Sequence, residues 1–321
     1  MQFEGGRIPE AVVHYILQAG IQAPSGDNAQ PWKFRAPGNV IDLYLDRKAD
    51  NSFFNIDQTA SIISCGAVLE NMRVAASVFG LSTDIELLPN QKEPDLMARV
   101  TLRFTMCDSD GLAPMIWQRQ TNRKFYGADP VAASDQDIIL QSITGFDGTR
   151  LHLITDRPAL KRLAGLVCRI DRIRTEHRPL HAHLNKMIRF TREEAVQKRD
   201  GLPLRNLEAG VAGELFLKIT RPWFIMNMAN RLGIGKLAAC HSLRGILKAG
   251  GAGLLTVNGT EAAALLTGGR ALERLWLTLS SLGIAMQPMT AITLFWHRWQ
   301  TEGDVSFQRI HRPLLERAWK D

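Results

Sequence analysis

The chain has 321 residues, of which 45% are hydrophobic and 22% charged, and its formal net charge at pH 7 is +7. This length and apolar content can bury a sizeable core in one large or two small domains, which excludes the disordered and fibrous classes. Much of the positive charge lies between residues 158 and 248, at helical spacing among apolar and acidic residues, a pattern typical of a solvated helix face. The same cations could shelter an anionic cofactor. Because no recognised nucleic-acid-binding motif accompanies them, we expect no nucleic-acid partner.

The length of the hydrophobic runs and the spacing of the cysteines indicate the cellular compartment of the protein. No run of 18 or more apolar residues occurs, so we expect no membrane span, and the first residues do not resemble a secretory signal. The cysteines are widely spaced, with no Cys-x-x-Cys or histidine-rich company, and we expect reduced thiols in a cytoplasmic protein and no zinc site. They are Cys65, Cys107, Cys168 and Cys240.

The first third of the chain predicts an alternation of helices and strands. Residues 9–20 begin with proline and end at glycine, as short helices do. A polar loop over 23–34 follows, and residues 40–46 alternate as a strand. Residues 58–79 form a helix that is apolar on most sides, which predicts a place in the middle of a core. Another strand is expected over 98–104.

The same order of elements recurs in the rest of the chain. The expected elements are a helix near 134–144, a strand at 150–156, a strand at 254–257 and a helix at 268–283. Residues 66–80 align with 269–283 at a constant offset of 203, with Gly, Leu-Glu, Ser and the final Gly coinciding, whereas the strands at 40–46 and 150–156 are only 110 apart. The second half therefore carries about 93 extra residues, an insertion over about 158–250 that is large enough to form a lid. Within it we expect helices at 160–175 and 179–199.

The loop Ala-Pro-Ser-Gly-Asp-Asn-Ala-Gln-Pro-Trp over 23–32 carries two prolines that favour extended neighbours and several turn formers with free donors. It resembles the N-terminal signature of the FMN-binding nitroreductase family. In that family the serine and asparagine lie against FMN and reach it across a dimer interface. The resemblance implies that Pro24, Ser25 and Asn28 contact the flavin.

The second half holds a complementary pattern. Arg119, Thr121 and Arg123 stand at alternate positions, so on an extended segment all three side chains project to one side. Paired guanidinium groups suit a phosphate of charge near −2, and an arginine stabilises a reduced flavin ring. The pattern resembles the family's Arg-x-Ser-x-Arg, which the first half lacks, while the second half lacks the loop. Solvated surface arginines are the alternative interpretation.

Further candidates rest on the resemblance alone. Gln287, Pro288 and Met289 leave the second central helix where family members offer a main-chain N–H to flavin N5, and Arg312 resembles the family's terminal phosphate contact. The expected fold is α+β: two nitroreductase-like halves, residues 1–110 and 111–321, fused into a pseudo-dimer with a mixed sheet, buried central helices and the helical lid insertion. A chain that contains both halves could be monomeric.

Two functions follow from the resemblance, and the sequence leaves both open. The first is an FMN-dependent oxidoreductase that transfers hydride from NAD(P)H through flavin N5 to a small-molecule acceptor such as a nitroaromatic or a quinone, without an obligatory acid or base residue. The second is an FMN-binding protein whose lid blocks turnover. A structural protein without flavin is a third interpretation. We expect one FMN per chain.

Overall fold

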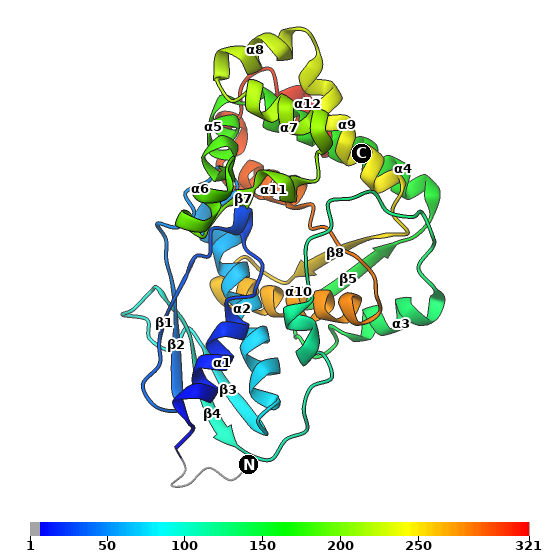
Figure 1. Ribbon diagram of the computed structural model, residues 1–321. Helices are drawn as coiled ribbons and strands as arrows, with labels where there is room; N and C mark the ends of the chain where they lie inside the picture. The colour runs from blue at the N-terminus through cyan, green and yellow to red at the C-terminus, as the bar shows by residue number, and fades with distance from the viewer. Residues whose placement is uncertain (1–6, 321) are drawn as a thin grey trace.

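The computed structural model describes residues 7–320, except for the side chains of residues 237–241 (Figure 1). The first half comprises α1 (Glu10–Gly20), β1 (Trp32–Arg35), β2 (Val40–Leu45), α2 (Thr59–Ser77), β3 (Leu81–Leu87) and β4 (Leu96–Phe104). The helices and strands expected here are confirmed to within about two residues, while β3 was not foreseen and β1 begins inside the stretch 23–34 that was expected to be a loop. Residues 1–6 and 321, the outer ends of the two expected halves, lie outside the described residues, as does the side chain of Cys240.

The four strands form one sheet in the order β1-β2-β4-β3, and every neighbouring pair is antiparallel. The expectation of a mixed sheet is wrong for this half. The strands β2 and β3, which α2 connects, do run in the same direction, but β4 lies between them and pairs antiparallel with both. The backbone N–H and C=O groups with which β2 and β3 could have paired directly are hydrogen-bonded to β4 instead.

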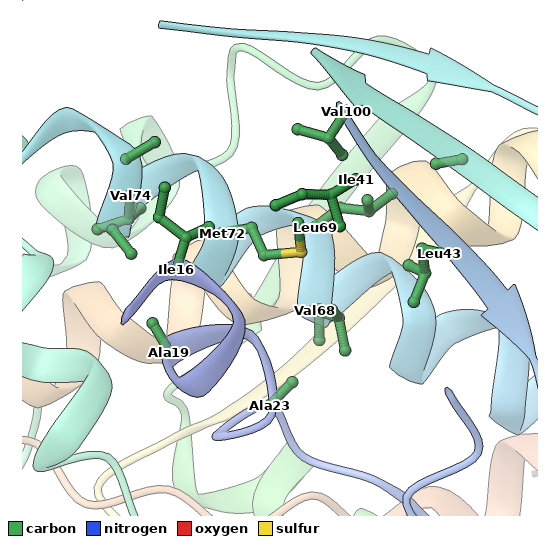
Figure 2. Packing of buried hydrophobic residues seen from close by; sticks show 14 of the residues in the cluster. Ile16, Ala19, Ala23, Ile41, Leu43, Val68, Leu69, Met72, Val74 and Val100 are labelled. Atoms are coloured by element: carbon green, nitrogen blue, oxygen red, sulfur yellow. The ribbon is translucent and has the colours of Figure 1, made fainter. Parts of the chain in front are cut away.

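The helix α2 is buried along nearly its whole length, as its apolar composition predicts. Figure 2 shows Ile16 of α1 beside Met72, while Ile41 and Leu43 of the sheet approach α2 from another direction. A helix without a solvated face can be stable only inside a core, so α2 is the element around which the first half packs.

The second half begins with α3 (Ala133–Gln141) and β5 (Thr149–Ile154), and returns after the insertion with β8 (Ala252–Val257), α10 (Ala262–Ser281), α11 (Thr290–Glu302) and α12 (Arg312–Ala318). β5 and β8 form an antiparallel pair whose Leu151 packs with Ile139 of α3 and Ala271 of α10. α11 and α12 pack instead against the first helix of the insertion through Phe295, Leu315 and neighbouring apolar residues.

The two central helices meet at a pair of glycines. A Cβ atom added to Gly66 of α2 would lie 2.2 Å from the carbonyl oxygen of Leu266, and one added to Gly269 of α10 would lie 2.0 Å from the carbonyl oxygen of Ile63. Gly66 and Gly269 are the residues that the offset of 203 equates, and Ile63 and Leu266 are equated by the same offset. The close approach of the backbones therefore needs glycine at both positions, and the contact is reciprocal.

The insertion is mostly helical, with α4 (Arg157–Glu176), α5 (Arg178–Met187), α6 (Arg192–Lys198), α7 (Gly210–Ile219), α8 (Trp223–Arg231), α9 (Ile234–Leu247) and the two-residue strands β6 (Ile188–Arg189) and β7 (Leu202–Pro203). The single helix expected over 179–199 is wrong, because the chain breaks between α5 and α6. Thr191 caps α6 by accepting a hydrogen bond from the Glu194 amide at 3.2 Å, and the Glu194 carboxylate accepts one from the Phe190 amide at 3.1 Å. No helix in the described residues is long and apolar enough to cross a membrane.

Candidate functional site

The polar loop after α1 has an unusual backbone. Asp27, Asn28 and Gln30 all have positive φ angles, of 47°, 57° and 52°. Left-handed conformations are costly for residues other than glycine, and they persist where the surrounding structure enforces them, often at functional sites. Here the Ser25 hydroxyl accepts a hydrogen bond from the Gln30 amide at 3.0 Å and closes the turn. Pro24 precedes this turn in the half-buried part of the loop.

The insertion closes onto this loop. The Asn28 side-chain amide donates to the Gly201 carbonyl at 3.1 Å, the Gly201 amide donates back to the Asn28 carbonyl at 3.2 Å, and the Gln30 side chain donates to the Arg199 carbonyl at 2.7 Å. A Cβ at Gly201, where φ is 71°, would lie 2.3 Å from the Met187 carbonyl oxygen, so the turn requires glycine. The side-chain amide of Asn28 is thus already hydrogen-bonded within the chain.

Asp27 is the charged centre of the loop. Its carboxylate lies 3.0 Å from Nε2 of His183 in α5. Burial alone would raise the pKa of Asp27, but the hydrogen bond with His183 and the positive charges of Arg174 and Arg123 outweigh it and lower the pKa below its usual range. Asp27 therefore stays ionised and faces cations from both the insertion and the second half.

Arg123 is the predicted residue that the structure brings to the loop. Burial lowers the pKa of its guanidinium, and the negative charge of Asp27 opposes this shift. Its Nη1 donates to the Asn206 carbonyl at 3.4 Å, a long hydrogen bond. Arg123 is therefore a partly desolvated cation whose charge interacts with that of Asp27 in the first-half turn.

Thr121 and the exit of α10 lie beside each other. Thr121 and Met286 form a parallel bridge, and the Asn122 amide donates to the Met286 carbonyl at 2.9 Å. Tyr126 connects the same two segments through hydrogen bonds with the Asn122 side chain and the Gln287 backbone. Burial raises the pKa of Tyr126, and these hydrogen bonds oppose the rise only in part. The structure thus brings the segment that holds Thr121 and Arg123 beside Met286 and Gln287, which lie more than 160 residues further along the chain.

Arg119 has a different environment. Its side chain is only 9% exposed, and its Nε lies 3.2 Å from a carboxylate oxygen of Glu273. Its Nη2 donates to the Gln22 carbonyl at 2.6 Å, and its guanidinium lies 4.5 Å from the Trp276 ring centroid. Burial raises the pKa of Glu273, the nearby charge of Arg119 opposes this rise only in part, and the resulting pKa is about 7. Arg119 thus ties α10 to the end of α1. Glu273 was not among the predicted residues, although a glutamate inside an apolar helix was a visible signal.

The remaining candidates lie elsewhere. Arg312 begins α12 and pairs with Asp304 at 2.7 Å, and no contact in the described residues brings it to the loop. Met289 packs against a cluster that includes Leu160 and Ile246, and Pro288 is half-buried between Gln287 and Met289. His183, Arg174 and Gly201 were missed by the sequence analysis, because their part in the site depends on how the insertion folds back.

No family model matches the chain. It is 26% identical over 292 residues to an uncharacterized protein of Mycobacterium tuberculosis strain CDC 1551 / Oshkosh; the match covers 89% of this chain but only 40% of that relative's length. It is 25% identical over 292 residues to the M. tuberculosis protein named "Putative NAD(P)H nitroreductase acg", covering 88% of this chain and 81% of that one. A further M. tuberculosis protein named "Putative NAD(P)H nitroreductase" is 28% identical over 130 residues, or 40% and 38% of the two chains. The chain is thus a distant relative of proteins named as NAD(P)H nitroreductases.

Proposed function

We propose that the chain binds one FMN and acts as an NAD(P)H-dependent oxidoreductase on a nitroaromatic, quinone or similar small acceptor. The relatives' names support this activity at the level of the family. The observation that carries the proposal is that the insertion contacts both Arg123 of the second half, which donates to the Asn206 carbonyl, and the strained first-half turn, whose Asn28 donates to the Gly201 carbonyl. These are the two parts that the family resemblance assigns to one flavin.

The residues present fit an anionic cofactor. Arg123 is partly desolvated and only weakly bonded, so a phosphate would add the charged hydrogen bonds that its guanidinium lacks. Thr121 would donate its hydroxyl, and the backbone at Gln287, Pro288 and Met289 would lie along the ring. When bound, the flavin would supply hydride transfer at N5. The chain itself would hold and orient the reactants and exclude water.

The geometry refines the roles of the other candidates. Pro24, Ser25 and Asn28 would shape one wall, with Ser25 fixing the turn and Asn28 holding the insertion. Arg119 would position the surrounding elements and would not bind the phosphate itself, since its guanidinium is paired with Glu273. Arg312 stays a prediction of the sequence alone.

The closure of the insertion favours a second candidate function. Gly201, Arg199 and His183 all contact the loop that would line the flavin. A cover held by several hydrogen bonds would restrict access to the ring, as in a protein that binds FMN and prevents turnover.

We also propose that the chain is a fused pseudo-dimer. The reciprocal contact of Gly66 and Gly269 supports this, because residues equated by one offset touch each other as they do at a two-fold interface. The reason for a single flavin per chain would then be that each half has kept only one part of the site.

The test is anaerobic reduction of the purified protein loaded with FMN. Bleaching by NADH or NADPH within seconds supports the oxidoreductase, while reduction by dithionite alone supports the sequestering protein. Arg123→Ala should weaken FMN binding by about tenfold to a hundredfold, since hydrogen bonds to charged groups contribute about 1.5–3 kcal/mol. Arg150→Ala, on an exposed position of β5, is the matched control and should bind normally. Failure of the wild type to bind FMN would refute both functions.

A further inference from the structure

Two successive helices of the insertion, α7 and α8, expose large apolar side chains at regular spacing. On α7 the exposed residues follow a spacing of four, and on α8 the series continues beyond the end of the helix. Their side chains are between 52% and 88% exposed. We call this set the insertion face: Val211, Leu215, Ile219, Phe224, Met228 and Leu232. Large apolar side chains scattered singly are normal on a protein surface, but these six recur about every four residues along two helices, which is the pattern of a helix face that binds a partner.

The opposite sides of the same helices face α4 and α5 of the insertion. Phe216 of α7, Thr220 just after it and Met226 of α8 line a cavity of about 180 Å³ together with residues of α4 and α5. Met226 and Ala229 are buried. The insertion face therefore cannot rotate inward without losing this packing. Figure 1 places α7 and α8 at the end of the molecule away from the four-stranded sheet.

The charge around the insertion face is strongly positive. Between residues 209 and 236 the chain carries four cations and a single acid, Glu214. Three of the cations, Lys218, Arg221 and Arg231, are exposed on or beside α7 and α8. Amphipathic helices with apolar side chains on one side and Lys or Arg beside them bind in the plane of a membrane interface, and anionic lipids strengthen the binding.

A second copy of the chain fits this surface less well. A two-fold interface brings the same patch of both subunits together, so Lys218, Arg221 and Arg231 would face their own counterparts with little acid to compensate. We propose that the insertion face docks on the surface of an anionic lipid bilayer, without spanning it. This inference does not depend on flavin binding.

The test uses flotation of the full chain with vesicles. The protein should float with vesicles that contain phosphatidylglycerol and stay behind with pure phosphatidylcholine. Lys218→Ser/Arg221→Ser should weaken partition by about thirtyfold, since each cation near an anionic surface contributes about a factor of five. Leu215→Ser/Phe224→Ser should also lose binding. The control Met106→Ser/Val305→Ser changes side chains of similar exposure, 80% and 75%, outside the insertion and should float as the wild type does.

Three results would overturn the proposal. The first is no flotation of the wild type with phosphatidylglycerol vesicles. The second is unchanged flotation of Leu215→Ser/Phe224→Ser, with circular dichroism confirming that the variant is folded, because binding would then be purely electrostatic. The third is a wild-type dimer in sedimentation that this variant converts to a monomer, which would assign the insertion face to a second copy.

Discussion

Replacing Gly66 by alanine should destabilise the protein, although the same change stabilises an ordinary helix by about 1 kcal/mol. The added Cβ would lie 2.2 Å from the Leu266 carbonyl oxygen and 2.9 Å from the Cα of Gly269. Both are backbone atoms and cannot rotate away, so α2 and α10 would have to separate by at least 0.8 Å to restore a 3.0 Å contact. Overpacking of this kind costs about 1–3 kcal/mol, and lost packing along two buried helices adds to it. We expect a net loss of about 2 kcal/mol or more.

Urea unfolding followed by far-UV circular dichroism measures this change. Gly269→Ala should behave like Gly66→Ala, because its Cβ would lie 2.0 Å from the Ile63 carbonyl oxygen. Gly165→Ala in α4 is the matched control, since its Cβ would meet nothing within 4 Å and should leave stability unchanged or raise it. The reasoning is refuted if Gly66→Ala proves as stable as Gly165→Ala.

Two further changes test the surroundings of the site. Burial raises the pKa of Glu273 from its ordinary 4.5 to about 7. Since the folded value lies above the unfolded one, its contribution to stability is complete below about pH 4.5 and is lost as the pH rises through about 7, a difference of roughly 3 kcal/mol. Glu273→Gln should therefore flatten the dependence of the unfolding free energy on pH between 5 and 8, and an unchanged slope in urea titrations would contradict the burial argument. His183→Ala removes the hydrogen bond to Asp27. The backbone amide hydrogens of residues 26–30 should then exchange with solvent deuterium roughly ten to a hundred times faster, since a charged hydrogen bond contributes about 1.5–3 kcal/mol. Exchange as slow as in the wild type would show that the insertion is held without this contact.

The sequence predicted most of the helices and strands well. The proline and glycine that bound α1, the apolar composition of α2 and the alternation of β2 all act through local rules of helix and strand formation. The offset of 203 also equated Gly66 with Gly269 before their contact was known. The break between α5 and α6 was missed, although Thr191 and Glu194 form the Thr-x-x-Glu pattern that signals a helix start.

The tertiary structure alone decided how the candidate residues are used. The sequence grouped Arg119 with Arg123, yet the first pairs with a buried glutamate on α10 while the second faces the loop at Asp27. It also gave no sign that Asn28 would bond to Gly201, which is 173 residues away. Periodicity and capping operate over a few residues, so they determine which elements form. Which charges meet depends on the packing of whole helices, and that packing brings together residues that no local pattern connects.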